Sequence, residues 1–379
     1  MTKKYVFKKR WKRVLIGLFD FIVGALFLIP KIFRKPLSEN PKHILVIRLD
    51  SLGDGVLTLP AIRTLQERFP VAKIDFLVSP AIRDLFRILF PNATVHTFEN
   101  TWLSDKASFR KSWDEFFRTV KKLRELHYDL GIDFRGDLRS ILLMRFAKIP
   151  NRWGRGRTGG GFLLTRSSPQ ALKHEVLENV ELVKVGGTSE RPQFQTPSLP
   201  VHSKESIEKW LAPFKAERKI IIHPGAGYPS KRWPLQNFAT LVQKIQKEKL
   251  GLPIFIGSSE EKNILSSYQN QLKGQFLDLV GKTSLEELLS LLAQADLFIG
   301  NDSGPAHLAA LLGLKSVVVF SGTNDFRRWA PWSSVLRILH HPVPCSPCEE
   351  KECPLERHFC MEDISAEEVF RAVEEMLRD

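Results

Sequence analysis

The most constraining feature of the chain is a short turn, Asn-Asp-Ser-Gly-Pro-Ala-His at residues 301–307, that lies between a strand pattern and a helix pattern. Residues 295–300 predict a short buried strand, and residues 308–313 predict a helix that ends at a glycine. Free N–H groups at a helix start attract phosphate, and Gly304 lets a ligand approach the backbone closely. The Asp302 carboxylate fits such a site if it binds hydroxyls beside the phosphates, as in a nucleotide sugar. An ordinary capped turn is the structural alternative.

A second strand–loop–helix segment, at residues 219–247, has the same character. Residues 219–222 predict a buried strand, and residues 223–234 form a glycine- and proline-rich loop with the basic pair Lys231 and Arg232. Ligands of open α/β sheets bind outside the carboxyl ends of the strands. The two loops therefore predict a site for a phosphate-bearing ligand in this half of the chain.

The N-terminal half opens on a third pattern of this kind. Residues 43–48 predict a strand, residues 49–55 form the turn Leu-Asp-Ser-Leu-Gly-Asp-Gly, and the helix that follows carries Leu-Pro-Ala at residues 59–61. Together with the two segments above, these motifs resemble glycosyltransferase family 9, the bacterial lipopolysaccharide heptosyltransferases. The resemblance covers residues 42–379 and identifies the family more specifically than the sugar.

The resemblance implies both a fold and an activity. The fold is α/β of the GT-B type, in which two doubly wound Rossmann-like domains face a cleft. The activity is the inverting, metal-independent transfer of heptose from ADP-heptose to lipid A-linked core oligosaccharide in lipopolysaccharide biosynthesis. One alternative is transfer of another sugar, such as N-acetylglucosamine, in cell-envelope glycan assembly. A second is a non-catalytic nucleotide-sugar-binding protein, against which the presence of both Asp54 and Lys231 argues.

Two residues are the candidates for catalysis. Asp54 follows the first strand and matches the family's catalytic aspartate, which acts as general base on the acceptor hydroxyl. Helix N-capping is the structural alternative for Asp54, and Asp50 is the second candidate for the base. No Asp-x-Asp pair is placed to bridge a metal ion to the diphosphate. Lys231, which precedes a Trp-Pro pair as the family's lysine does, is therefore expected to offset the charge of the leaving group.

The residues expected to bind the donor follow strands of the C-terminal half. They are Gly227, Glu260, Thr283, Asp302, Ser303, Gly304 and His307. Asp302 is expected to contact sugar or ribose hydroxyls, and the backbone at Ser303 and Gly304 to contact phosphate. His307, one helical turn further on, either reaches back to the phosphates or stabilises the loop. The resemblance adds Glu260 for the ribose hydroxyls and Thr283 at a helix start beside the adenine.

Arginines of the N-terminal half are candidates for binding an anionic acceptor. Arg135 follows a predicted strand, and residues 151–157 form a loop that contains Arg152, Arg155 and Arg157. Arginine suits carboxylates and phosphates because its planar fork of donors matches their geometry. Arg135 and Arg155 are the leading candidates, and a solvated basic surface is the alternative for each.

Strand and helix patterns alternate along the chain, which predicts a parallel sheet in each half. Strands are expected at residues 73–78, 128–134, 253–256, 276–279, 297–299 and 316–320, and helices at 81–89 and 108–126. The expected parts are a membrane-anchor segment at 1–37, an acceptor-binding domain at 42–190, a connection at 191–216 and a nucleotide-sugar-binding domain at 217–379.

The formal net charge of +14 predicts an anionic partner. No nucleic-acid-binding motif is present in the sequence, so a membrane surface and a lipid-linked anionic oligosaccharide explain the charge better. An apolar run at residues 14–29, flanked by basic residues and interrupted by Gly17, Asp20 and Gly24, is shorter than the roughly 20 residues of a comfortable span. It favours a peripheral or monotopic helix on the cytoplasmic face of the inner membrane, with a tilted single span as the alternative.

All four cysteines lie in one short segment. Cys345, Cys348, Cys353 and Cys360 have the spacing C-x2-C-x4-C-x6-C, which could hold a structural zinc ion. Disulfides are not expected in the cytoplasm. Any metal here is expected to be structural, because the resemblance implies no metal in the chemistry.

Overall fold

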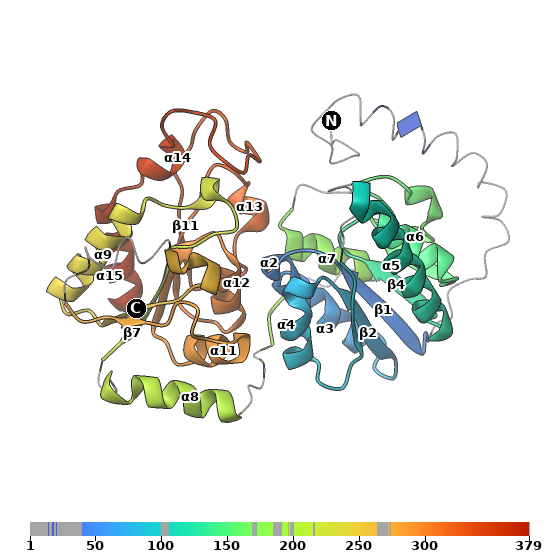
Figure 1. The fold of residues 1–379 in the computed structure, drawn as a ribbon, viewed down its shortest axis with the longest axis horizontal. Coiled ribbons are helices and arrows are strands. Elements are labelled where there is room, and N and C mark those ends of the chain that lie inside the picture. The colour runs from blue at the N-terminus through green and yellow to red at the C-terminus, as the bar shows by residue number, and fades with distance from the viewer. Residues whose placement is uncertain are drawn as a thin grey trace. The chain divides into compact units, whose positions relative to one another are not determined.

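A computed structural model gives the fold of the chain (Figure 1). It describes residues 14, 17, 18, 20, 40–99, 106–168, 173–184, 192–195, 197, 201–214, 217–263, 272 and 274–378, with backbone alone at 106–111 and 201–202. The chain divides into two compact units, Met1–Gln193 and Phe194–Asp379. Each unit contains one parallel sheet covered by helices, which confirms the predicted α/β class.

The sheet of the first unit has six strands in the order β3-β2-β1-β4-β5-β6, all parallel. The strands are β1 His43–Arg48, β2 Lys73–Val78, β3 Val95–Thr97, β4 Leu130–Asp133, β5 Asn151–Gly154 and β6 Arg166–Ser167. This is the doubly wound order, in which the chain changes direction across the sheet beside β1. The central strand β1 is buried from Ile44 to Arg48 because helices cover both of its faces.

The helices of the first unit connect these strands. They are α2 Leu52–Val56, α3 Leu59–Arg68, α4 Arg83–Leu89, α5 Lys106–Glu125, α6 Leu138–Phe146 and α7 Glu175–Val183, with short 3-10 turns η2 Pro80–Ile82 and η3 Gly161–Leu163. Helix α5 presents Phe116, Val120 and Leu123 to the core, at the i, i+4, i+7 spacing of one helix face. The predicted helix at 108–126 thus matches α5 closely, whereas the predicted strand at 128–134 is shortened to β4.

The sheet of the second unit has the same winding, with the order β12-β11-β10-β7-β8-β9. The strands are β7 Lys219–His223, β8 Leu252–Phe255, β9 Leu277–Asp278, β10 Leu297–Asn301, β11 Ser316–Val319 and β12 Leu336–Leu339. All neighbours are parallel. Because β7 and β10 are neighbours, the two loops singled out in the sequence begin side by side at one edge of this sheet.

The helices of the second unit follow the same alternation. They are α8 Val201–Leu211, α9 Leu235–Lys247, α11 Leu285–Ala293, α12 Gly304–Leu311, α13 Phe326–Trp329, α14 Phe359–Glu362 and α15 Ala366–Arg378, with η4 Ala212–Phe214, η5 Pro229–Lys231 and η6 Ser259–Glu261. Helix α9 buries Phe238, Leu241, Val242 and Ile245, again at helical spacing. Trp233 is fully buried in this core, where its indole N–H donates to the Ile364 carbonyl at 2.8 Å.

The boundary between the two units lies inside the predicted connection at residues 191–216. The chain divides after Gln193, and helix α8 in the predicted connection packs against α11, so part of that segment belongs to the second unit. The predicted anchor at 1–37 lies outside the described residues, except for Val14, Gly17, Leu18 and Asp20. Among the helices that the structure describes, none is long and apolar enough to cross a bilayer.

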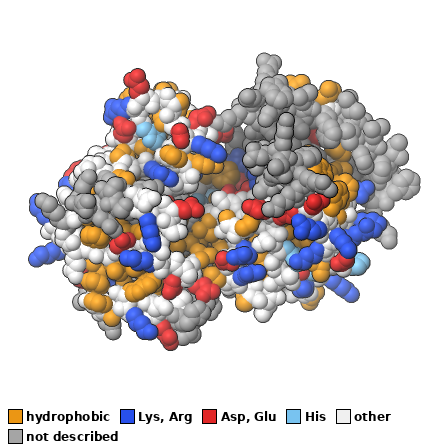
Figure 2. All heavy atoms as spheres, in the orientation of Figure 1, with side chains coloured by type: hydrophobic (Ala, Val, Ile, Leu, Met, Phe, Trp, Pro, Cys, Tyr) orange, Lys and Arg blue, Asp and Glu red, His pale blue; other side chains and the backbone are white. Residues whose placement is uncertain are grey.

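Charged side chains are distributed over the surface of the described residues. On the face shown in Figure 2, Lys and Arg side chains are interspersed with Asp and Glu side chains. The described basic side chains are therefore not gathered into a single stripe on this face.

Candidate active site

The candidate base of the first unit lies just beyond the carboxyl end of β1. Asp54 is in the first turn of α2, whose N-cap is Ser51. The Ser51 hydroxyl donates to Asp54 Oδ2 at 2.6 Å, and the Ser51 backbone N–H lies 3.3 Å from the same oxygen. Arg48 Nη2 donates to the other oxygen, Oδ1, at 3.1 Å. The side chain of Asp54 thus closes a capping box and still exposes 23% of its surface, so capping and proton transfer are compatible roles.

Arg48 is the buried centre of this corner of the site. Its side chain is 2% exposed and is surrounded by carboxylates, with Nε 3.1 Å from Asp50 Oδ2 and Nη1 3.8 Å from Glu175 Oε1. Burial disfavours the charged guanidinium, yet Asp50, Asp54 and Glu175 together raise the pKa of Arg48 above its ordinary value. A permanently charged arginine therefore orients both candidate bases, Asp50 and Asp54.

A further carboxylate at the end of β4 was missed in the sequence. Asp133 is completely buried and accepts backbone N–H groups from Arg135 at 3.1 Å and Asp137 at 2.9 Å. Burial, reinforced by the nearby Asp137 carboxylate, raises the pKa of Asp133 to about 7. In the sequence, the one signal for Asp133 is its position near the end of a predicted strand. Its burial depends on the whole sheet, in which β4 pairs with β1.

The structure separates the two arginines that were predicted to bind the acceptor. Arg135 keeps 35% of its side chain exposed, and its Nη1 lies 3.1 Å from Asp50 Oδ1. Arg155, by contrast, is 1% exposed, donates to Asn179 Oδ1 at 3.2 Å and pairs with Glu175 at 3.5 Å. Its guanidinium is enclosed by partners from α7, so these contacts give no support to the prediction that Arg155 binds the acceptor and are those of a structural residue. Arg157 is buried in the same network, 2.6 Å from Glu178 Oε2.

The second unit brings three of the predicted site residues together. Lys231 Nζ lies 2.6 Å from Asp302 Oδ2, and His307 Nε2 lies 3.8 Å from Asp302 Oδ1. Burial alone would raise the pKa of Asp302, but its contacts with His307 and Lys231 lower it below its ordinary value. The result is a buried carboxylate held between two basic side chains at the carboxyl ends of β7 and β10.

The start of α12 adjoins this cluster. Ser303 is the N-cap residue of α12, and its hydroxyl lies 3.0 Å from His223 Nδ1. Within the described part of the chain, the Ser303 side chain makes no cap hydrogen bond to the helix. The helix begins with Gly304 and Pro305, and Pro305 has no N–H. The other N–H groups of the first turn can still face an anion, and the helix dipole favours negative charge there.

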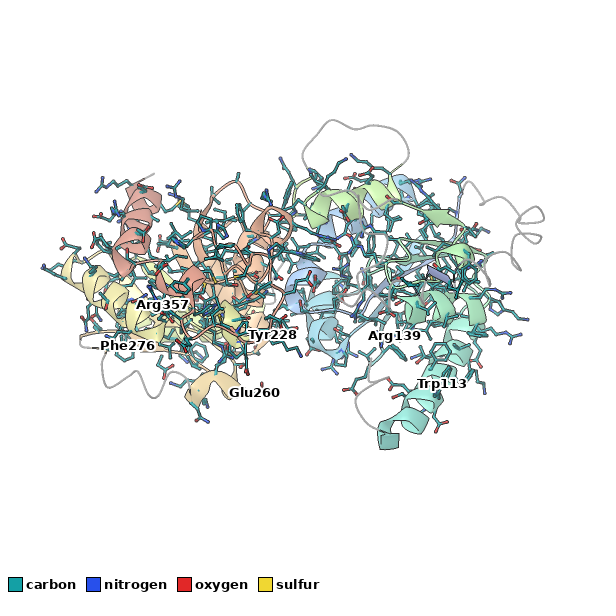
Figure 3. All side chains as sticks on the ribbon, turned by 90° about the horizontal axis from the view of Figure 1, so that it is seen from above. Trp113, Arg139, Tyr228, Glu260, Phe276 and Arg357 are labelled. Atoms are coloured by element: carbon teal, nitrogen blue, oxygen red, sulfur yellow. The ribbon has the colours of Figure 1, made fainter. Side chains whose placement is uncertain are left out.

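The acidic residue that turns into this region is Glu261, not the predicted Glu260. Glu260 is exposed on η6 (Figure 3). Glu261 Oε2 accepts the Ser258 N–H at 2.7 Å and lies 3.5 Å from His223 Nε2. Burial raises the pKa of Glu261, but the contacts with His223 and Ser258 outweigh it and lower the pKa to about 2. A Cβ added at Gly225 would lie 1.8 Å from Glu261 Oε1, so a larger residue there would require this carboxylate to move.

The two remaining donor candidates sit at the surface. Gly227 is exposed, and a Cβ added there would meet nothing within 4 Å, so sterics do not require a glycine. Thr283 is half-buried and precedes Ser284, which is the N-cap of α11 and closes a capping box with Glu287. The helix start predicted at this point is therefore present one residue later.

The four cysteines all belong to the described residues, and none of them is disulfide-bonded. Cys345 is exposed, Cys348 and Cys353 are half-buried, and Cys360 is buried. Across the described residues, no group of three or more His, Cys, Asp or Glu side chains is arranged to hold a metal ion. The predicted zinc site therefore gains no support from the structure.

Comparison with known proteins gives consistent matches. A family model for glycosyltransferase family 9 (heptosyltransferase) matches residues 116–358. Lipooligosaccharide heptosyltransferase 2 of Campylobacter jejuni is 27% identical over 333 residues, which cover 86% of this chain and 96% of the relative.

Two solved structures share the fold. The Escherichia coli ADP-heptose lipopolysaccharide heptosyltransferase II has a TM-score of 0.72 at 22% identity, covering 89% of this chain and 98% of that chain. The E. coli heptosyltransferase WaaC with ADP-2-deoxy-2-fluoro heptose has a TM-score of 0.64 at 18% identity, covering 88% and 99%.

Proposed function

This chain belongs to glycosyltransferase family 9, and from that premise we propose that it transfers a heptose from ADP-heptose to the lipid A-linked core oligosaccharide of lipopolysaccharide. The observation that carries the proposal is the Lys231–Asp302–His307 cluster beside the start of α12. It combines hydroxyl-binding and phosphate-binding groups in one place, as a nucleotide sugar requires. A related solved structure with an ADP-sugar analogue supports ADP as the nucleotide.

We propose that the reaction is a single displacement with inversion at the anomeric carbon. Asp54 takes the proton from the acceptor hydroxyl as its oxygen attacks that carbon, while the bond to the diphosphate oxygen breaks and ADP leaves. Arg48 keeps the Asp54 carboxylate oriented through the 3.1 Å contact. Lys231 and the N–H groups at the start of α12 stabilise the negative charge that develops on the diphosphate, and on this basis the reaction needs no metal ion.

We propose that the acceptor is bound by the first unit and that Arg135 contributes to it. Its exposed guanidinium lies beside Asp50, at the same strand ends as Asp54. An anionic core oligosaccharide would provide carboxylates or phosphates for this side chain. We also propose that residues 1–37 hold the enzyme at the cytoplasmic face of the inner membrane, where a lipid-linked acceptor is concentrated.

The test is a transfer assay with ADP-heptose and a soluble core fragment, followed by mass spectrometry. The parent should add one heptose in the presence of EDTA, and Asp54→Asn should lower kcat by roughly 100-fold or more with donor affinity nearly unchanged. Asp84→Asn, on an exposed side chain paired with Arg83, is the matched control and should retain full activity. Transfer from UDP-N-acetylglucosamine but not from ADP-heptose would contradict the donor assignment. A strict need for a divalent cation would contradict the metal-free mechanism.

A further inference from the structure

Helices α5 and α6 expose two large aromatic side chains on the surface of the first unit. Phe117 of α5 is 54% exposed and Phe146 of α6 is 50% exposed. The Trp113 ring stacks on Phe117 with centroids 5.7 Å apart, and buried Phe116 lies 6.1 Å from Phe146 in an edge contact. Figure 3 shows Trp113 on α5 near the outer edge of its unit. We call the surface formed by Trp113, Phe117 and Phe146 the aromatic face.

Basic side chains surround the aromatic face. Those exposed on α5, α6 and the residues just after α6 are Arg118, Lys121, Lys122, Arg124, Arg145 and Lys148. The exposed acidic side chains in the same part of α5 are Asp114 and Glu125. Lys121 follows Trp113 and Phe117 at four-residue spacing, so it lies on the same side of the helix. Exposed aromatic rings bordered by an excess of positive charge are typical of a surface that contacts an anionic bilayer.

Asp20, within the apolar run at residues 14–29, contacts the first unit beside α6. Asp20 Oδ1 accepts the Gly160 backbone N–H at 2.9 Å, across 140 residues of sequence. Gly160 packs on α6, because a Cβ added there would lie 2.5 Å from Leu138 and 3.8 Å from Ile141. Helix α6 has nine residues and is about 13 Å long. Asp20 contacts Gly160 near the N-terminal end of this helix, and Phe146 is its last residue.

We propose that the aromatic face is a second membrane contact, which inserts into the headgroup region of an anionic bilayer alongside residues 1–37. The occupant is the lipid surface because the rim is basic, the centre is aromatic, and Asp20 of the apolar run contacts Gly160 beside α6. The proposal rests on the proposed place of action at the membrane but not on the identity of the sugar. Membrane contacts at both places would orient the first unit, and with it Asp54, relative to the lipid-linked acceptor.

The test uses full-length protein and vesicles of phosphatidylcholine alone or with phosphatidylglycerol added, with binding measured by flotation. The double variant Phe117→Ser/Phe146→Ser should bind the anionic vesicles roughly 10- to 100-fold more weakly, because two half-exposed phenyl rings no longer enter the interface. Lys121→Glu/Arg145→Glu should remove most of the preference for phosphatidylglycerol. The matched control Val71→Ser/Leu355→Ser, at side chains 83% and 51% exposed, should bind like the parent.

Other outcomes would overturn the proposal. Unchanged vesicle binding in both face variants would exclude a lipid contact. Light scattering could show that the parent is a dimer and the aromatic variant a monomer, with vesicle binding unchanged. In that case the aromatic face joins two copies of the chain. Tighter binding by the aromatic variant would mean that the face normally covers the N-terminal segment. Transfer activity on a soluble acceptor should stay unchanged in every variant. Absence of this activity in the parent would contradict the proposed function, but it would not affect the vesicle-binding result.

Discussion

Replacing Arg48 should destabilise the first unit and slow the reaction at the same time. Arg48→Met keeps the length of the side chain but removes its charge from among three carboxylates. Glu175 is completely buried, and Asp50 and Asp54 are 15% and 23% exposed, so none of them is fully solvated when the arginine is lost. The variant therefore leaves buried negative charge without its main partner.

The distances set the size of the effect. At an effective dielectric constant of about 20, each 3.1 Å contact contributes about 5 kcal/mol, and the 3.8 Å contact about 4 kcal/mol, before desolvation is counted. Desolvation of the buried ions cancels most of this sum, and breaking one buried pair typically costs about 3–5 kcal/mol. We expect Arg48→Met to lose an amount in this range, and Arg48→Lys to lose less because it keeps the charge but not the fork of donors.

The assay is urea unfolding, with hydrogen exchange at β1 and β4 to assign the transition to the first unit. Arg63→Met is the matched control, because Arg63 pairs with Glu67 at the surface and should cost no more than about 0.5 kcal/mol. In the transfer assay kcat should fall with ADP affinity retained, since the candidate donor residues belong to the second unit. A free energy of unfolding within about 1 kcal/mol of the parent, with kcat unchanged, would refute this account of Arg48.

Three further outcomes are expected. Lys231→Ala should weaken ADP and ADP-heptose alike in calorimetry, since it removes the cation nearest Asp302, and equal binding by parent and variant would argue against a phosphate contact. Arg155→Met should lower the free energy of unfolding and leave acceptor KM unchanged, whereas Arg135→Ala should raise acceptor KM with little effect on stability. The pKa of Glu261 is lowered to about 2 from 4.5, so its contribution to stability is present above pH 4.5 and is lost as the pH falls through 2. Glu261→Gln should flatten the unfolding profile across that window, and an unchanged slope would contradict the assigned contact with His223.

The elements of the fold and the family could be predicted because their signals are local. Apolar runs of strand length, helical periodicity and glycine-bearing turns are properties of a few neighbouring residues, and burial in a parallel sheet requires them. The loops predicted to begin after residues 48, 222 and 300 therefore lie within one residue of the observed ends of β1, β7 and β10. The sequence predicted that both loops serve one phosphate-bearing ligand, whereas the contact of Lys231 with Asp302 comes from the structure, in which β7 and β10 are neighbours.

What only the tertiary structure decided is the environment of each charged side chain. Glu260 and Glu261 are adjacent in a 3-10 turn, so they point in different directions, and the composition of the loop does not say which one meets His223. The prediction from the sequence is the same for Arg135 and Arg155, because each lies in a loop of the N-terminal half. In the structure, partners from α7 enclose only Arg155. Burial of an ionised group depends on whether opposite charges distant in the chain arrive beside it, and the sequence alone does not contain those distances.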